Sequence, residues 1–282
     1  MTDRIDVAVV GATGLVGEHL LEILAQRAFP VGELHALASE RSVGNTVMFR
    51  GRPVAVQNVA DFDFSQAQIA LFSAGAAVSA EHAPRAGAAG CIVVDNTSRF
   101  RNDPDIPLVV PEVNPEAIAD YPPQNIIANP NCSTIQMVVA LKPIHDAAGI
   151  ERINVATYQS VSGAGRRQVE SLASTSARLL NGQPIELPAG EKQIAFNAVP
   201  HIDTFQDNGY TREEMKMVWE TRRILGDESL RVNPTAVRVP VFYGHSEAIH
   251  IETVDPIRAE DVRRLLESAP GVVVVDERET GG

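Results

Sequence analysis

The first glycine-rich turn constrains the fold of this chain more than any other feature. Residues 5–10 are an apolar strand candidate, residues 11–17 read Gly-Ala-Thr-Gly-Leu-Val-Gly, and residues 18–27 are a predicted helix. In a strand–turn–helix context, glycines let the backbone turn tightly and approach a pyrophosphate, which rests on the helix N-terminus. The spacing is Gly-x-x-Gly-x-x-Gly rather than Gly-x-Gly-x-x-Gly, and a plain turn that needs positive φ angles is the alternative. We predict a dinucleotide-binding unit.

An arginine and two hydroxyls follow the second predicted strand, at residues 33–38. In NAD-specific proteins an acidic residue commonly ends this strand and holds the ribose 2′-OH. Here Ser39 ends it, and Glu40, Arg41 and Ser42 follow. Arg41 with the two hydroxyls suits a 2′-phosphate, so we predict NADP rather than NAD. Glu40 counts against this interpretation, and a solvated polar loop is the alternative.

Further buried strands end in small or polar residues. These strands are predicted at 69–72 and 91–94, and later ones at 109–110 and 126–127. Ligands of open parallel sheets lie off the carboxyl ends of the strands, so residues that follow those ends can meet cofactor or substrate. The residues placed in this way are Ser73, Ala74, Gly75, Asn96, Thr97 and Arg99. Arg99 alone could equally be a surface arginine. Five or more strand–helix units predict a doubly wound parallel sheet of the Rossmann type.

A cysteine stands where a strand passes into a helix. Residues 129–134 read Asn-Pro-Asn-Cys-Ser-Thr and precede an amphipathic run. Pro130 favours extended backbone before the helix, and Asn131 or Ser133 can cap it. Cys132 therefore lies at or beside a helix N-terminus, where the dipole favours a thiolate, the form that attacks a carbonyl carbon. A small buried cysteine is the structural alternative.

The second half of the chain mixes strands and helices less regularly. A predicted strand at 153–158 runs into a second glycine-containing turn at 162–165, which we interpret as a loop that brings backbone close to a bound ligand. Other predicted helices and strands follow at 166–180, 212–225, 235–241, 248–254, 259–268 and 272–275. This mixture predicts an α+β second domain with a mixed sheet that holds the substrate.

Four charged or titratable side chains of this half are candidates for a site. Glu213 and Lys216 are three apart on a helix that begins with a capping box, although a surface ion pair would explain them too. Arg238 lies in an alternating strand whose odd-numbered face is aliphatic, so we expect it on the opposite face, where it needs an anion or water. His245, beside a glycine, could act as an acid or base near neutral pH. His250 is interpreted as structural or solvent-facing.

Composition excludes some classes of function. The 282 residues carry a formal net charge of -12 and no Lys/Arg cluster, so we expect no nucleic-acid partner. Only Cys91 and Cys132 occur, which predicts a reducing, cytoplasmic location rather than a disulfide framework. No signal-peptide pattern and no bilayer-spanning apolar run are present, so no membrane partner is expected. No metal site is predicted.

Together these motifs resemble the aspartate-β-semialdehyde dehydrogenase family. The matching segments stand in family order and are jointly specific, although no single one is: residues 11–17, 129–134, Gln159 with 162–165, Glu213 with Lys216, 237–240 and 244–247. The resemblance implies an oxidoreductase that carries out NADP-dependent reductive dephosphorylation of L-aspartyl-4-phosphate to the semialdehyde, with phosphate as the other product. This step belongs to amino-acid biosynthesis, toward lysine through diaminopimelate, methionine, threonine and isoleucine. A homodimer or homotetramer built on the second domain is also implied.

The resemblance further implies roles for single residues. Cys132 would be the nucleophile that forms a thioester, and His245 would shuttle the proton. Asn131 would position the reacting carbonyl. The residues implied to bind substrate are Gln159, which orients it, Arg238 for the α-carboxylate, Glu213 for the α-ammonium, and Arg99 and Lys216 for the phosphate. The residues implied to line the cofactor are Gly11, Thr13, Gly14, Leu15, Val16, Ser39, Arg41, Ser42, Ser73, Ala74, Gly75, Asn96, Thr97, Ser162 and Gly163.

The expected organisation is an NADP-binding Rossmann domain at 1–131 and a catalytic and dimerisation domain at 132–282. The family normally continues with another strand and a long helix that returns to the first domain and helps to close the cofactor site. This sequence stops at Gly282, so either it is cut or the protein is a shortened relative. We expect weaker NADP binding and reduced stability or activity from these residues alone.

Three other functions compete with this interpretation. N-acetyl-γ-glutamyl-phosphate reductase uses the same chemistry, but its acetylated substrate amine has no charge for Glu213 to meet. A phosphorylating glyceraldehyde-3-phosphate dehydrogenase differs around the cysteine and usually takes NAD. A catalytically impaired nucleotide-binding homologue is the alternative from a different functional class.

Overall fold

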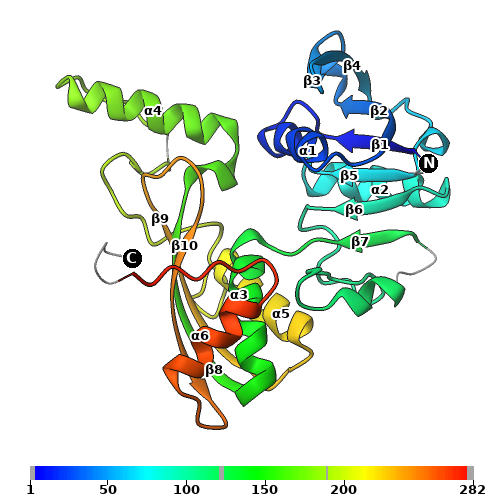
Figure 1. The fold of residues 1–282 in the computed structure, drawn as a ribbon. Coiled ribbons are helices and arrows are strands. Elements are labelled where there is room, and N and C mark those ends of the chain that lie inside the picture. The colour runs from blue at the N-terminus through cyan, green and yellow to red at the C-terminus, as the bar shows by residue number, and fades with distance from the viewer. Residues whose placement is uncertain (1–3, 121–123, 189, 278–282) are drawn as a thin grey trace. The chain divides into compact units, whose positions relative to one another are not determined.

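The computed structural model describes residues 4–120, 124–188 and 190–277. Contacts between residues divide the chain into two compact units. The first comprises Met1–Val109 and Glu116–Pro130, and the second comprises Val110–Pro115 and Asn131–Gly282. Figure 1 shows both units, each built on its own sheet.

The first unit contains a seven-stranded sheet in the order β3-β4-β2-β1-β5-β6-β7. The strands are β1 (Ile5–Val10), β2 (Val31–Ala38), β3 (Thr46–Phe49), β4 (Arg52–Asn58), β5 (Ile69–Phe72), β6 (Ile92–Asp95) and β7 (Ile126–Ala128). All neighbouring pairs are parallel except β3 with β4. The doubly wound parallel sheet predicted from the sequence is therefore confirmed.

Strands β2 and β5 lie on opposite sides of β1 in the sheet. From β1 the chain passes through α1 (Leu15–Gln26) to β2 on one side, and it later returns to β5 on the other side. Helix α2 (Ala76–Ala88) then joins β5 to β6. The central strand is buried, with Val9 and Val10 each 0% exposed. A crevice off the carboxyl end of β1 is the position where open sheets of this kind bind ligands.

Two details of the first unit differ from the sequence-based prediction. A hairpin of β3 and β4 stands between β2 and β5, and neither of its strands was predicted from the sequence. Arg50 and Gly51 both have positive φ angles, 49° and 74°, which closes the hairpin in two residues. The strand expected at 109–110 does not form either. Only one bridge, Leu108 with Ala128, joins this segment to the edge strand β7.

The second unit contains a three-stranded sheet in the order β10-β8-β9. Its strands are β8 (Ile150–Gln159), β9 (Arg231–Arg238) and β10 (Ser246–Thr253). Strand β9 runs parallel to β8 and β10 runs antiparallel to it, so the predicted mixed sheet is confirmed. The helices of this unit are α3 (Cys132–Ala148), α4 (Arg166–Leu180), α5 (Arg212–Leu225) and α6 (Ala259–Ser268).

One face of this sheet carries the core of the second unit. Ile153 and Val155 of β8 pack with Met137 of α3 and Met217 of α5, and all four are nearly or fully buried. On β9 the even-numbered Pro234 and Ala236 lie on this buried face. The core therefore follows the even-numbered side chains of β9.

One expectation for this unit agrees with the structure and one is wrong. Arg238 lies on the even-numbered face of β9, opposite the odd-numbered side chains, as expected, and this face continues the one that packs on the core. The strand expected at 272–275 is extended chain without sheet partners, and Val273 is 86% exposed. The helices expected at 212–225 and 259–268 agree with α5 and α6.

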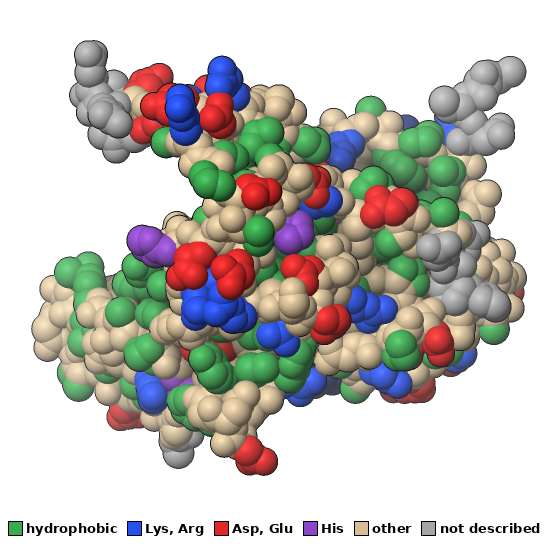
Figure 2. Space-filling view, turned by 90° about the horizontal axis from the view of Figure 1, so that it is seen from below, with side chains coloured by type: hydrophobic (Ala, Val, Ile, Leu, Met, Phe, Trp, Pro, Cys, Tyr) green, Lys and Arg blue, Asp and Glu red, His purple; other side chains and the backbone are tan. Residues whose placement is uncertain are grey.

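The surface charge, the length and apolar character of the helices and the placement of metal-binding side chains bear on which partners this protein can have. On the face shown in Figure 2, Lys and Arg side chains are interspersed with Asp and Glu side chains. Among the described residues, no helix has the length and apolar character needed to cross a membrane. Within the same residues, no cluster of three or more His, Cys, Asp or Glu side chains is arranged to hold a metal ion.

Candidate active site

Cys132 is the first residue of helix α3. Its neighbour Asn131 is extended, with φ -63° and ψ 145°, and caps the helix by accepting a hydrogen bond from the N–H of Ser133 at 3.0 Å. The side chain of Cys132 is exposed, whereas Cys91 in the first unit is buried, and burial raises the pKa of Cys91 to about 12. The sulfur therefore lies at a capped helix start, where the helix dipole favours negative charge.

His245 lies against this sulfur. Its Nε2 is 3.2 Å from the Sγ of Cys132. On the opposite side of the ring, Nδ1 is 3.1 Å from the backbone nitrogen of Ser160 and 3.2 Å from the Ser160 hydroxyl. Burial and then the positive charge of Arg238 lower the pKa of His245, although Glu213 acts in the opposite direction. The imidazole is therefore neutral near pH 7.

A buried carboxylate organises the amide side chains beside the cysteine. Glu213 is 6% exposed, and its Oε1 accepts hydrogen bonds from Asn131 Nδ2 at 3.0 Å and from Gln159 Nε2 at 3.1 Å. Its Oε2 lies 2.9 Å from Lys216 Nζ. Burial alone would raise the pKa of Glu213, but the charge of Lys216 and these hydrogen bonds outweigh it and lower that pKa. Glu213 is therefore an ionised carboxylate with several donors.

Lys216 is held between two carboxylates. Besides Glu213 it contacts Asp203, with its Nζ 3.0 Å from Oδ2. Burial would lower the pKa of Lys216, but the two carboxylates together raise it. The ammonium group is therefore charged and fixed in position, so this pair is more than the surface ion pair that spacing alone would suggest.

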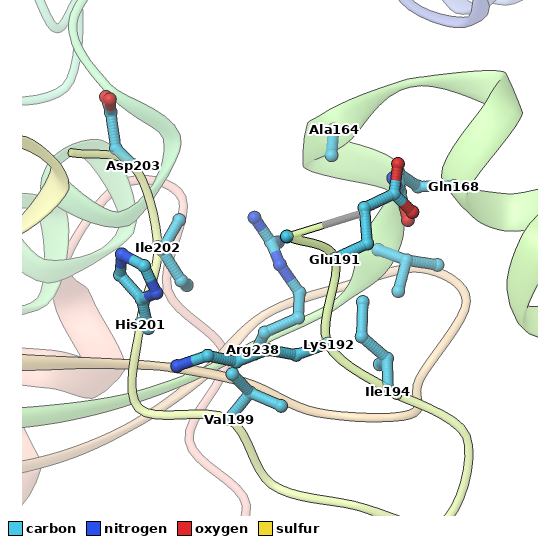
Figure 3. Close-up of a pocket in the computed structure, with 12 residues that line it drawn as sticks. Ala164, Gln168, Glu191, Lys192, Ile194, Val199, His201, Ile202, Asp203 and Arg238 are labelled. Carbon is cyan, nitrogen blue, oxygen red and sulfur yellow. The ribbon is translucent and has the colours of Figure 1, made fainter. Parts of the chain in front are cut away.

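Arg238 ends β9 directly opposite Gln159 of β8. Its guanidinium donates a hydrogen bond to the backbone oxygen of Ser160 and extends into a pocket of about 220 Å³. In Figure 3 its side chain stands in the middle of this pocket, with His201 and Asp203 on one side and Glu191 on the other. Burial lowers the pKa of Arg238, which keeps its charge because an ordinary guanidinium titrates far above neutral pH.

The sheet register brings these groups together. Along the buried face of β8, the side chains change from Ile153 and Val155 to Thr157 and Gln159. Gln159 is 1% exposed, and its Oε1 accepts a hydrogen bond from Thr157 Oγ1 at 3.1 Å. The face that is hydrocarbon at one end of the strands is therefore polar at the other, where Arg238 also ends. Seven predicted site residues meet in the second unit: Asn131, Cys132, Gln159, Glu213, Lys216, Arg238 and His245.

Sequence reasoning missed three residues that hold this cluster. Ser160 contacts His245, Asp203 contacts Lys216, and Thr157 orients Gln159. Asp203 lies in an irregular segment that carried no periodic signal. Ser160 and Thr157 could have been found from the alternation of β8, since Thr157 shares a face with Gln159 and Ser160 follows at the strand end.

The glycine turn of the first unit leaves space at the carboxyl end of β1. Gly11 has φ +91°, and a Cβ there would lie 3.0 Å from both the backbone nitrogen of Ala74 and the Ser73 hydroxyl. Gly14 is the N-cap of α1 and offers no side chain of its own, so the first N–H groups of the helix remain available. Glycine is thus needed both for the turn and for the close approach of the segment after β5. This cradle fits a pyrophosphate group.

The other predicted cofactor residues of the first unit follow neighbouring strands. Ser39 and Arg41 are exposed beyond β2, and Ser42 ends the same short turn. Asn96 accepts a hydrogen bond from Asn129 at 2.6 Å, and Thr97 N–H donates one to the buried carboxylate of Asp95 at 3.0 Å. The remaining predicted residues are Thr13, Leu15, Val16 and Gly75 in the first unit, and Ser162 and Gly163 in the second.

Arg99 also belongs to the first unit. Its guanidinium lies over the ring of Phe100, 4.9 Å from the ring centroid, and its backbone N–H donates a hydrogen bond to the Thr97 hydroxyl at 3.2 Å. Its expected role in binding phosphate remains a prediction.

Comparison with known proteins gives matches over nearly the whole chain. The family model "Semialdehyde dehydrogenase, NAD binding domain" matches residues 6–121, and "Semialdehyde dehydrogenase, dimerisation domain" matches residues 141–281. The aspartate-semialdehyde dehydrogenase 2 of Vibrio cholerae is 64% identical over 272 residues, which cover 96% of this chain and 81% of that protein. The aspartate-semialdehyde dehydrogenase of Legionella pneumophila is 62% identical over 276 residues, 98% of this chain and 80% of that protein.

Solved structures give the same result. Aspartate semialdehyde dehydrogenase II from Vibrio cholerae, crystallised as a complex with ASA, superposes with a TM-score of 0.94 at 63% identity, covering 96% of this chain and 80% of that chain. The enzyme from Candida albicans with NADP superposes with a TM-score of 0.72 at 27% identity, covering 94% of this chain and 76% of that chain. The chain spans about four fifths of the length of the first of these proteins.

Proposed function

Since the chain belongs to the aspartate-semialdehyde dehydrogenase family, we propose that it catalyses the reversible, NADP-dependent reductive dephosphorylation of L-aspartyl-4-phosphate to L-aspartate-4-semialdehyde. This reaction would supply lysine, methionine, threonine and isoleucine biosynthesis. The observation that carries the proposal is the 3.2 Å contact between Cys132 Sγ and His245 Nε2 at the start of α3. A sulfur at this position meets the needs of a nucleophile that attacks an activated acyl group.

The first step is attack by the Cys132 sulfur on the acyl carbon. A C–S bond forms, the bond between that carbon and the phosphate oxygen breaks, and phosphate leaves with the bonding electron pair. Asn131 positions the reacting carbonyl, and Gln159 orients the substrate. The shared hydrogen bonds of their amide groups to Glu213, at 3.0 and 3.1 Å, support these positioning roles because they fix both side chains.

NADPH, when bound, would supply the hydride that reduces the thioester carbon. His245 would shuttle the proton at the sulfur-bearing centre as the C–S bond breaks and the aldehyde forms. The glycine turn at Gly11 and Gly14 would hold the pyrophosphate, and Arg41 with the Ser39 and Ser42 hydroxyls would bind a 2′-phosphate. The positive charge of Arg41 beside the Ser39 hydroxyl, both exposed beyond β2, supports NADP over NAD because these groups can meet a 2′-phosphate.

The charged side chains of the second unit match the two ends of the substrate. Arg238 binds the α-carboxylate, Glu213 the α-ammonium, and Lys216 the phosphate; Arg99 of the first unit is the other residue proposed to bind the phosphate. The lowered pKa of Glu213 supports this assignment, because it keeps the carboxylate ionised and therefore able to attract an α-ammonium group in addition to Lys216. The same observation disfavours N-acetyl-γ-glutamyl phosphate as substrate, since its acetylated nitrogen carries no charge. The match to a dimerisation domain supports a homodimer or homotetramer.

NADPH oxidation with aspartyl phosphate, compared with N-acetylglutamyl phosphate, tests the proposed reaction. We expect turnover with aspartyl phosphate alone, with the rate falling to background in Cys132→Ser while NADP binding is retained. Cys91→Ala is the matched control, because this thiol is buried in the other unit and should leave turnover intact. Turnover by Cys132→Ser, or preference for the N-acetylated substrate, would contradict the proposal.

A further inference from the structure

The two groups that Ser160 presents to His245 differ in what they can do. Its backbone nitrogen, 3.1 Å from Nδ1, can only donate a hydrogen bond. Its hydroxyl, 3.2 Å from Nδ1, can either donate or accept. An N–H that points at a ring nitrogen requires a lone pair there. Nδ1 of the neutral imidazole therefore carries no proton, and the proton resides on Nε2.

The Nε2–H group of this tautomer faces the sulfur of Cys132 at 3.2 Å. A nitrogen that already carries a proton cannot accept the proton of the thiol. It can donate a hydrogen bond to a thiolate, which the start of helix α3 also favours. The neutral imidazole thus stabilises the anionic nucleophile and does not deprotonate it. The thiol proton leaves to solvent, to which the exposed Cys132 has access.

The backbone of Ser160 is fixed on both sides. Its carbonyl oxygen accepts a hydrogen bond from Arg238, and the residue is 0% exposed, so water does not compete for these contacts. Its hydroxyl lies 2.9 Å from the Ser162 hydroxyl. If His245 becomes protonated, the new Nδ1–H can donate to the Ser160 hydroxyl, which can in turn donate to Ser162, and the backbone of Gly244 also favours the charged ring.

We propose that Ser160 is a positioning residue that sets the proton location on His245. Its N–H keeps the neutral ring in the Nε2–H tautomer, and its hydroxyl accepts a hydrogen bond from Nδ1–H whenever the ring is charged. His245 therefore meets Cys132 as a hydrogen-bond donor and not as a base. This inference rests on the proposed function for the roles of Cys132 and His245 and adds the residue that determines how they interact.

Other charged groups around the ring are unaffected by changing the Ser160 hydroxyl. They are Cys132 on α3, Arg238 on β9 and Glu213 on α5, with Glu247 two residues beyond the ring on β10. A shift in the pKa of His245 caused by replacing Ser160 would therefore report the hydroxyl itself.

The tautomer is measured directly by ¹⁵N NMR of the protein labelled at histidine, with the His245 signals assigned by their loss in His245→Asn. At neutral pH we expect an unprotonated Nδ1 and a protonated Nε2. A protonated Nδ1 in the unmodified protein would overturn the proposal. This readout needs no turnover, so it stands apart from any failure of the proposed reaction.

The role of the hydroxyl is tested with Ser160→Ala, and Ser160→Thr serves as the conservative variant. We expect the pKa of His245 in Ser160→Ala to fall by about one unit, as loss of one hydrogen bond to a charged group predicts. The acid limb of the pH profile of kcat/KM should move by the same amount, and Ser160→Thr should restore both values. An unchanged titration of His245 in Ser160→Ala would refute the role of the hydroxyl.

Discussion

Glu247 is a buried carboxyl group that the proposed reaction does not use. It lies on β10 opposite Thr157 of β8, on the face that carries the core. Both of its carboxylate oxygens are buried, and no described residue satisfies either with a hydrogen bond of normal geometry. Burial raises the pKa of Glu247 from 4.5 to about 7, and the Gln136 amide offsets this only in part. The folded protein therefore holds a proton here that the unfolded chain releases.

This proton makes stability depend on pH in a defined direction. Below pH 4.5 the group is protonated in both states, and its contribution to stability is fully present. As the pH rises through the folded pKa of about 7, the unfolded chain is already ionised and the contribution is lost. The shift of about 2.5 units corresponds to about 3 kcal/mol, of which about 2.5 kcal/mol is lost between pH 5 and pH 8.

Glu247→Gln isolates this effect, because glutamine keeps the shape and cannot ionise. Urea unfolding of both proteins at pH 5 and pH 8 gives the free energy of unfolding, and all other titrating groups cancel in the comparison. Between pH 5 and pH 8, we expect the free energy of unfolding of the wild type to fall by about 2.5 kcal/mol relative to that of the variant, so that the variant gains in relative stability at pH 8. Parallel pH dependences for the two proteins would refute the reasoning.

Three further substitutions test other contacts. In Gly17→Ala the new Cβ would lie 2.1 Å from the carbonyl oxygen of Gly11, so we expect the free energy of unfolding in urea to fall by about 3 kcal/mol and NADP binding to weaken. An unchanged free energy of unfolding and an unchanged affinity for NADP would contradict this. Thr211→Ala removes the cap that accepts a hydrogen bond from Glu214 N–H at 3.3 Å and should lower the free energy of unfolding by about 1 kcal/mol. Asp95→Ala leaves three donors without their buried acceptor, so we expect the free energy of unfolding measured by calorimetry to fall by more than about 1 kcal/mol. A smaller fall would count against the role of Asp95 in shaping the loop after β6.

Local patterns in the sequence were sufficient for much of the fold. The glycine turn at 11–17 sits between β1 and α1 as expected, because its signal depends on three adjacent elements. Thr211 forms the predicted capping box with Glu214, since both partners lie within one turn. The position of Cys132 at the start of α3 was predicted for the same reason.

Features set by tertiary contacts could not be predicted in this way. The contacts of Arg238 depend on where β9 ends and on its register with β8, and neither is visible in its alternation. The two hydrogen bonds of Ser160 to His245 join residues 85 positions apart. Asp203 reaches Lys216 from a segment without periodicity. The hydrophobicity of 272–275 suggested a strand, but no neighbouring strand pairs with it among the described residues.

The continuous face of β8 has a consequence for how this protein can vary. Ile153 and Val155 belong to the hydrocarbon interior, and Gln159, four residues after Val155, belongs to the proposed site. An enlarged side chain at Val155 would push the strand away from α3 and carry Gln159 with it. Substitutions in that interior that change thermal stability will therefore also shift Gln159, so stability and the geometry of the proposed site are coupled.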